Sequence, residues 1–245
     1  MNSTIDLLKA HRSIRQFQKR RIQPDLFEDL IKAGQAAASS NFFQAATIIR
    51  VTDLQKRSKL ASLANNQAYV ETAAEFLVFC ADMNRAASCC DFHGSEANTG
   101  FTEQFIIATV DAALVAQNIV VASESAGLGI CYIGALRNNP AEVSMVLDLP
   151  HNTYPVFGLC LGWPDQNPEV KPRLPINIVL RENSYGNGAD GANFSDYDEA
   201  IRSYYATRSS NQKSMSWSEQ MSGMLSKESR PHMLDFLKTK GFLRK

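Results

Sequence analysis

HRSIRQF, residues 11–17, is the stretch that decides how the fold of this chain is interpreted. Two arginines, a histidine and a serine fall within five positions, and Ile14 and Phe17 are spaced as buried residues are. The whole chain is neutral, with 25 basic and 25 acidic side chains among its 245 residues. Because a neutral chain has no overall field that attracts nucleic acid or anionic lipid, we expect Arg12 and Arg15 to bind something local and small. We expect no nucleic-acid partner and no membrane partner.

The composition is that of a globular protein. Apolar residues make up 44% of the chain and charged residues 20%, which is ordinary for a chain that buries a substantial core in one large domain or two small ones. We find no repeat and no independent second domain, so we expect a single domain over residues 1–245. The segment PDQNPEVKPRLP is proline-rich and polar, and from about residue 165 onward we expect an extended arm that must pack on something to be stable.

The five cysteines indicate no disulfide framework, because their number is odd and their spacing irregular. Cys80, Cys131 and Cys160 lie in apolar, strand-like runs and are interpreted as small core residues. The segment CCDFH, residues 89–93, lacks a second pair of ligands, so we predict no metal site.

The most hydrophobic segment starts at Phe105 and contains Asp111, Gln117, Asn118 and Glu124. These polar residues favour a buried helix over a membrane span. The start of the chain shows no basic leader followed by an apolar run. We therefore expect a cytoplasmic protein.

The order of predicted elements is that of a mixed α/β chain. Helices are predicted for IDLLKA after Ser3 or Thr4, from Pro24 onward, over 102–126, and in NPAEVSMVL, DYDEAIRSYYATR and RPHMLDFLKTKG. Strands are predicted at 47–53, 75–82, 129–136, 153–164 and in INIVL, residues 176–180. The helix over 102–126 is apolar on all sides, which is typical of a helix sunk in one core or shared between two subunits.

Common catalytic motifs are missing from the sequence. In GLGICYIG the third glycine of a dinucleotide fingerprint is replaced by Tyr132, and the run enters a strand instead of a helix. No phosphate-binding P-loop, G-x-S-x-G elbow or H-E-x-x-H sequence occurs, and the four histidines are scattered. Hydrolase and metalloenzyme functions are weakly supported.

Residues suited to binding an anion remain. HRSIR supplies two guanidinium groups, a hydroxyl and an imidazole, and KPR supplies Lys171 and Arg173. Arginine suits bidentate phosphate recognition. ASSNF, residues 38–42, adds small hydroxyls beside an aromatic ring. The alternative is that these are solvated surface charges.

Several stretches in a fixed order resemble the FMN-dependent nitroreductase superfamily, within it the oxygen-insensitive NADPH nitroreductases and NADPH–flavin oxidoreductases. They are HRSIRQF, NNQAYV, GICYIGALRNNP, FGLCLGWP followed by KPRLP, YYATRSSN and KESRP. The resemblance implies an α+β fold with a central, mostly antiparallel sheet flanked by helices. It also implies an intertwined homodimer with a C-terminal arm that reaches over the partner, and one noncovalent FMN per subunit at the interface.

The resemblance further implies site residues. The residues that would contact FMN are His11, Arg12, Ser13, Arg15, Ser39, Gln67, Tyr132, Ile133, Gly134, Ala135, Lys171 and Arg173. Those that would bind NADPH or the acceptor are Ser40, Asn41, Phe42, Tyr69, Glu103, Arg208, Lys213, Lys227 and Arg230. Asn41, Ala135 and Lys213 depart from the residues common in the family, which are serine, glycine and arginine. For Lys213 a solvated surface charge is an equal alternative.

The implied activity is an NADPH oxidoreductase with a ping-pong mechanism. NADPH would reduce FMN, and nitroaromatics, nitrofurans, quinones or free flavins would then take two electrons in the same place. Since the cofactor carries the chemistry, no side chain is predicted as a catalytic acid or base. Alternatives are a dedicated flavin or quinone reductase, an FMN-binding redox sensor without turnover, and a small-anion binding module.

Overall fold

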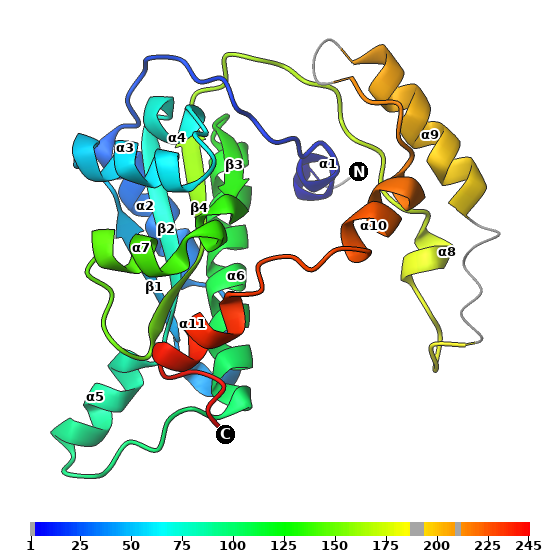
Figure 1. Cartoon of the computed structure of the whole chain (residues 1–245). Helices are drawn as coiled ribbons and strands as arrows, with labels where there is room; N and C mark the ends of the chain where they lie inside the picture. The colour runs from blue at the N-terminus through cyan, green and yellow to red at the C-terminus, as the bar shows by residue number, and fades with distance from the viewer. Residues whose placement is uncertain (1–2, 187–193, 209–211) are drawn as a thin grey trace. The chain divides into compact units, whose positions relative to one another are not determined.

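A computed structural model describes residues 3–186, 194–208 and 212–245 (Figure 1). These residues divide into two compact units. The larger contains the chain up to Asn167 together with Arg230–Lys245, and the smaller contains Pro168–Ser229. The last three residues of the YYATRSSN stretch lie outside the described residues. That the chain folds as a single domain stays a prediction.

A four-stranded antiparallel sheet lies at the centre of the larger unit, within the described residues. Its strands are β1 (Ala46–Arg50), β2 (Glu75–Asp82), β3 (Gly129–Ile133) and β4 (Thr153–Gly162), in the spatial order β1-β2-β4-β3. Every neighbouring pair is antiparallel. The predicted central antiparallel sheet is therefore confirmed.

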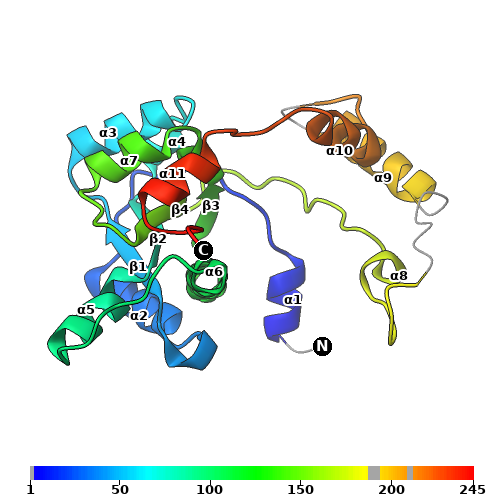
Figure 2. The ribbon, with the colours of Figure 1, turned by 60° about the horizontal axis from the view of Figure 1, so that its bottom comes forward.

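Helices cover both faces of this sheet because its buried strands alternate their side chains between two hydrophobic cores. In β2, Phe76 and Val78 face one core, and Leu77 and Phe79 face the other. The first core is closed by α3 (Leu54–Leu63), α4 (Tyr69–Thr72) and α7 (Pro140–Val146), and the second by α2 (Pro24–Gln35) and α6 (Thr102–Ser125). Figure 2 shows the two helical layers on opposite sides of the strands.

The long helix α6 has the length and composition of a membrane span. In the structure it packs on the sheet and on α2, with Ala112, Ala116 and Ile119 buried completely, so it is a core helix as predicted. Its opposite side leaves a stripe of three apolar side chains, Ile106, Val110 and Leu114, between 41% and 49% exposed.

The HRSIRQF segment is extended and follows the short helix α1 (Ser3–Lys9). Ser13 forms a parallel bridge with Ile130 of β3, and the Ile14 amide donates to the Ile130 carbonyl over 2.8 Å. The close approach requires Gly129, because a side-chain carbon there would lie 2.5 Å from the Ile14 side chain. Ile14 and Phe17 are both buried, so this segment is anchored to the core through its apolar residues.

Some predicted elements were wrong or incomplete. Residues 176–180, predicted as a strand, instead contain the one-turn helix α8 (Ile176–Val179), which begins directly after Pro175. The strand predicted over 129–136 ends at Ile133, where the chain turns into the 3₁₀ helix η2 (Gly134–Asn138). Four helices were not predicted: α3, α4, α5 (Asn84–Phe92) and α10 (Trp217–Leu225).

The remaining elements complete the two units. In the larger unit these are the 3₁₀ turn η1 (Ser40–Phe42) and α11 (Met233–Thr239), whose Phe236 and Leu237 are buried. The smaller unit contains α8, α9 (Phe194–Thr207) and α10. A small core of Tyr197, Ile201 and Tyr205, with Trp217 packed against it, joins α9 and α10.

Candidate functional site

The extended N-terminal segment carries its polar side chains along the edge of β3. His11 lies with its Nδ1 atom 2.6 Å from a carboxylate oxygen of Glu124, which stands near the end of α6. Arg12 lines a cavity of about 400 Å³ together with Glu124, Gly129 and Gln166. The predicted cluster is thus held in place by β3 on one side and by the end of α6 on the other.

Arg15 contacts Tyr69, a predicted site residue from a distant part of the sequence. It hydrogen-bonds to the hydroxyl of Tyr69, which belongs to α4. Burial raises the pKa of this Tyr69 hydroxyl, as does the nearby Cys131, and the hydrogen bond from Arg15 opposes the rise. The structure therefore brings Arg15 and Tyr69, which are 54 positions apart, into one place.

Gln67 has a buried polar atom that lacks a partner. Within the described residues its side-chain oxygen Oε1 makes no hydrogen bond although it is shielded from solvent. A buried acceptor left unsatisfied costs roughly 1–3 kcal/mol, so native structures rarely keep one without a reason. Gln67 lies two residues before Tyr69, so this unpaired oxygen is an argument for a ligand beside the Arg15–Tyr69 pair.

The end of β3 turns sharply into η2, as the predicted contact segment of Tyr132, Ile133, Gly134 and Ala135 requires. Tyr132 is partly exposed and Ile133 is buried. Gly134 lies close to Arg137, because an added side-chain carbon would be 3.3 Å from the Arg137 Nη2 atom. Arg137 itself donates from Nη1 to the carbonyl of Val156 over 2.6 Å.

Arg230 joins this end of β3 from the far end of the chain. Its Nε atom donates to the Asn138 side-chain oxygen over 2.9 Å. Burial lowers the pKa of Arg137, and the positive charge of Arg230 lowers it further. Two guanidinium groups that repel each other in this way form a place where an anion is favoured.

The loop of Ser39, Ser40, Asn41 and Phe42 has an unusual backbone. Asn41, Phe42 and Gln44 all have positive φ angles, between 46° and 58°, which residues other than glycine adopt at a cost. Phe42 is 80% exposed. This loop conformation therefore requires stabilising contacts from the rest of the structure.

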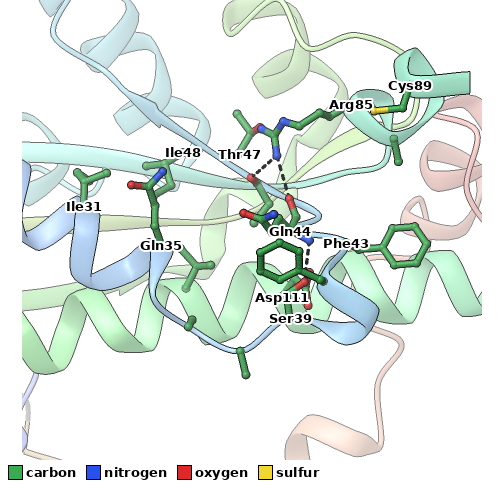
Figure 3. Close-up of a pocket in the computed structure, with 16 residues that line it drawn as sticks. Ile31, Gln35, Ser39, Phe43, Gln44, Thr47, Ile48, Arg85, Cys89 and Asp111 are labelled. Carbon is green, nitrogen blue, oxygen red and sulfur yellow. Dashed lines mark hydrogen bonds between the residues drawn. The ribbon is translucent and has the colours of Figure 1, made fainter. Parts of the chain in front are cut away.

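A buried carboxylate on α6 holds this loop. Asp111, 1% exposed, accepts hydrogen bonds from the Ser39 hydroxyl at 2.6 Å, the Ser40 amide at 3.2 Å and the Ala45 amide at 2.9 Å. The Ser39 hydroxyl in turn accepts from the Gln44 amide at 2.7 Å. Figure 3 shows Ser39 and Asp111 side by side beneath Gln44. The Ser39 hydroxyl proton thus goes to Asp111, and only one lone pair of its oxygen remains available to a further donor.

This loop lines a cavity of about 750 Å³, which is also lined in part by Ile31, Thr47, Ile48, Arg85 and Cys89. The Arg85 guanidinium donates to Thr47 Oγ1 at 2.6 Å and to the Gln44 carbonyl at 2.9 Å (Figure 3). Within the described residues, no group of three or more histidine, cysteine or acidic side chains is placed to hold a metal ion.

One chain does not bring all predicted residues together. Along α6, Glu103, Asp111 and Glu124 mark the positions of three groups of predicted residues. At 1.5 Å per helical residue, Asp111 and its loop lie about 20 Å from Glu124 and His11, and Glu103 lies about 30 Å away. The loop of residues 39–42 and Glu103 therefore do not belong to the same pocket as His11 within a single chain.

The smaller unit gathers four of the predicted cations around two tyrosines of α9. Lys171 donates from Nζ to the Tyr205 hydroxyl over 2.9 Å. Arg208 and Lys213 lie 5.8 Å and 5.6 Å from the centre of the Tyr205 ring. Arg173 is close enough to Tyr197 to counteract, by its charge, the rise in the pKa of Tyr197 that burial causes. Lys227 is exposed and makes no contact of note in the described part of the chain.

Sequence reasoning missed three residues on which this geometry depends. Asp111 and Glu124 were interpreted only as evidence that α6 is not a membrane span, and Tyr205 was not singled out. The signal was present, because an isolated carboxylate in an apolar helix must find a partner. What the sequence did not contain was the identity of that partner.

Comparison with known proteins shows similarity along the whole chain. The nitroreductase family model matches residues 8–163, and the model of the nitroreductase family C-terminal domain matches residues 171–245. The chain is 48% identical to an NADPH-flavin oxidoreductase of Vibrio harveyi over 248 residues, covering 100% of both chains. It is 43% identical to an oxygen-insensitive NADPH nitroreductase of Salmonella typhimurium, covering 99% of both. Its structure matches that of an NADPH:FMN oxidoreductase of Vibrio harveyi complexed with NAD⁺, with a TM-score of 0.92, 45% identity and full coverage of both chains.

Proposed function

The chain belongs to the nitroreductase family, and we propose that it is an oxidoreductase that uses NADPH to reduce nitroaromatic compounds and flavins. The observation that carries this proposal is the full-length similarity to enzymes with those two activities. Because the similarity extends over both units, it includes the segments that hold every residue discussed above.

We assign FMN as the cofactor, and the donor set fits it. The unpaired Gln67 oxygen is an acceptor suited to the N–H group on the pyrimidine edge of a flavin. When bound, FMN supplies the centre that accepts a hydride and passes on two electrons. Arg12, Ser13, Lys171 and Arg173 would bind its phosphate, and the glycine at 134 would let the backbone approach its ring.

Arg15 has a role of its own in this assignment. A cation that cannot lose its proton favours extra negative charge beside it. Arg15 would lie at the pyrimidine side of the ring system, where the reduced cofactor carries that charge. Its hydrogen bond with Tyr69 limits the positions it can adopt, so its charge is delivered at a defined place.

The acceptor side of the site requires a second copy of the chain. The Ser39–Phe42 loop lies about 20 Å along α6 from the His11 cluster, and the stripe of Ile106, Val110 and Leu114 is exposed around the level of Asp111, which holds the loop. A homodimer that pairs these stripes would cover them, and would let the loop of one copy face the Gln67 region of the other. Ser40, Asn41 and Phe42 would then border the exposed face of the ring.

NADPH is distinguished from NADH by its 2′-phosphate. Arg208 supplies a planar pair of donors that matches a phosphate, and Lys213 adds a point charge. We therefore assign both to the coenzyme, and Lys227 and Arg230 to the nicotinamide and acceptor region. Comparison of kcat/KM for a nitroaromatic, a quinone and a free flavin identifies the preferred acceptor.

The proposal is tested by titrating the purified protein with NADPH, and separately with NADH, without oxygen. We expect a yellow protein whose flavin absorbance is bleached by one equivalent of NADPH and only slowly by NADH. A colourless protein that cannot be reconstituted with FMN would contradict the cofactor assignment. A yellow protein that neither coenzyme bleaches would contradict the enzymatic function.

A further inference from the structure

Tyr205 connects two groups of cations that belong to different ligands in the proposed function. It lies on the inner face of α9 in line with Tyr197 and Ile201, which are spaced four residues apart and share one side of the helix. Its side chain is only 5% exposed. A tyrosine held this firmly presents its hydroxyl and its ring in defined directions.

The hydroxyl of Tyr205 meets the group assigned to the FMN phosphate. It accepts the hydrogen bond from Lys171 Nζ at 2.9 Å. Earlier in α9, on the same side of the helix, the Tyr197 hydroxyl donates to the Pro172 carbonyl at 3.1 Å, which anchors the backbone between Lys171 and Arg173. A lysine on its flexible stem loses rotamer entropy when it binds an anion, and a lysine already held by a tyrosine loses less of it on binding. Two of its three donors remain for the phosphate.

The ring of Tyr205 meets the group assigned to the NADPH 2′-phosphate. Lys213 Nζ lies 5.6 Å from the ring centre and the Arg208 guanidinium carbon 5.8 Å. Both distances are within the range of about 6 Å over which a cation is attracted to an aromatic face. Arg208 is also 5.3 Å from the ring of Tyr204, so it is held between two aromatic residues.

The electrostatics agree with this picture. Burial alone raises the pKa of Tyr205, but the hydrogen bond and charge of Lys171, with the charges of Lys213 and Arg208, outweigh it and lower the pKa. Within the described residues, none of Lys171, Arg208 and Lys213 forms an ion pair with a carboxylate. Three cations that face one side chain without an acidic partner repel one another until an anion joins them.

We infer that Tyr205 is a positioning residue shared by both phosphate groups: its hydroxyl orients Lys171 for the FMN phosphate, and its ring orients Arg208 and Lys213 for the NADPH 2′-phosphate. The inference rests on the proposed function, since it concerns the same two ligands. It adds that the two sites depend on one side chain and that the two dependencies can be separated chemically.

Two substitutions in the full-length protein separate them. Tyr205→Phe removes only the hydroxyl, so we expect the dissociation constant of FMN to rise about tenfold. Riboflavin, which lacks the phosphate, should bind as it does to the wild type, and the preference of KM for NADPH over NADH should not change. Tyr205→Leu also removes the ring, so KM for NADPH should rise about threefold more than KM for NADH.

The binding readout is the fluorescence of free FMN or riboflavin in equilibrium with the protein, which does not depend on turnover. Tyr204→Phe is the matched control. It removes a neighbouring hydroxyl that only reaches the Glu169 carbonyl at 3.5 Å and keeps its ring beside Arg208, so FMN and riboflavin should bind unchanged.

Equal effects of Tyr205→Phe on FMN and riboflavin, or no effect on either, would overturn the inference while the proposed function stands. Wild-type protein that binds no FMN would overturn the proposed function and the inference with it. If Tyr205→Leu does not fold, Tyr205→Phe still tests whether the Tyr205 hydroxyl orients Lys171 for the FMN phosphate.

Discussion

Tyr154 is a buried phenol in the larger unit, 3% exposed, whose hydroxyl lies 2.5 Å from the hydroxyl of Thr109. Burial raises the pKa of Tyr154 to about 12, although the hydrogen bond with Thr109 and the charge of Arg137 partly oppose the rise. At neutral pH this residue contributes an ordinary buried hydrogen bond. Above pH 10 its contribution to the free energy of unfolding falls.

Tyr154→Phe tests this pKa through stability. An unfolded tyrosine loses its proton near pH 10, and the folded one near pH 12. The stabilisation from the neutral form is therefore complete below pH 10 and is lost as the pH rises from 10 to 12. At pH 8 we expect the free energy of unfolding of the wild type to exceed that of the variant by about 1 kcal/mol. Urea unfolding should show that this difference in the free energy of unfolding has disappeared by pH 11.5. A difference that stays constant with pH would contradict the raised pKa.

Arg208→Ala tests the coenzyme assignment. Removal of the guanidinium should raise KM for NADPH about tenfold or more while KM for NADH changes little, because only NADPH carries the 2′-phosphate. Steady-state kinetics with both coenzymes measures this. Arg202→Ala serves as a control, because Arg202 belongs to the same unit but is paired with Glu199 and Glu219. Equal losses for both coenzymes in Arg208→Ala would remove Arg208 as the discriminating residue.

At the scale of single residues, the sequence indicated which side chains could bind an anion, but not which residues they contact. HRSIR was identified because its charged residues are adjacent in the chain. Asp111 was not, because its partner Ser39 is 72 positions away. The same limit applies to the contact of Arg15 with Tyr69, since both were predicted as site residues and nothing in the sequence indicated that they touch.

Among the elements, the connection between α6 and the loop of residues 39–45 fixes the conformation of the loop that we propose for the acceptor side. One carboxylate satisfies two backbone amides and a hydroxyl of a loop with three positive φ angles. The loop is therefore positioned by a helix of 24 residues that is itself embedded in the core.

Asp111→Ala should be far more costly than the loss of an ordinary cap. It leaves three donors without their acceptor, so we expect a loss of about 3 kcal/mol in the free energy of unfolding. Asp53→Ala is the control, because Asp53 also accepts two backbone amides, as the N-cap of α3, but is exposed. Its loss should be about 1 kcal/mol. Similar urea midpoints for the two variants would contradict the role given to Asp111.

Elements were predictable where their pattern was local. The strand at 75–82 was predicted with its observed bounds, because it is a continuous apolar run that ends in aspartate. The INIVL segment is also apolar and is richer in β-branched residues, yet no strand of the described part of the chain pairs with it and it begins after a proline, so it closes one helical turn instead. Helix α3 was missed because its sequence, LQKRSKLASL, is mostly polar, although Asp53 in front of it is a clear N-cap.

For the whole molecule, the exposed stripe of Ile106, Val110 and Leu114 on α6 is the feature that favours assembly with a second copy. A helix that is buried on one side and apolar on the other requires a cover. The proposed homodimer supplies it and places parts of each site on different copies.

Val110→Asp tests this assembly. A carboxylate in the centre of the stripe should be incompatible with a buried interface, so the variant should run as a monomer of 27.1 kDa while wild type runs at about twice that mass, by light scattering after gel filtration. It should also retain less FMN. Leu54→Asp, at another exposed apolar position on α3, should leave both properties unchanged. A dimeric Val110→Asp protein would exclude the stripe as the interface.

The division into two units also distributes the two tryptophans. Trp163 belongs to the larger unit, where the Arg20 guanidinium lies 3.6 Å from its ring centre, and Trp217 belongs to the smaller unit, packed against Phe194 and Tyr197. Replacing either one with phenylalanine leaves a protein whose indole emission comes from a single unit. The chain thus contains a separate optical reporter for each unit, with which the order of their folding can be timed in one stopped-flow instrument.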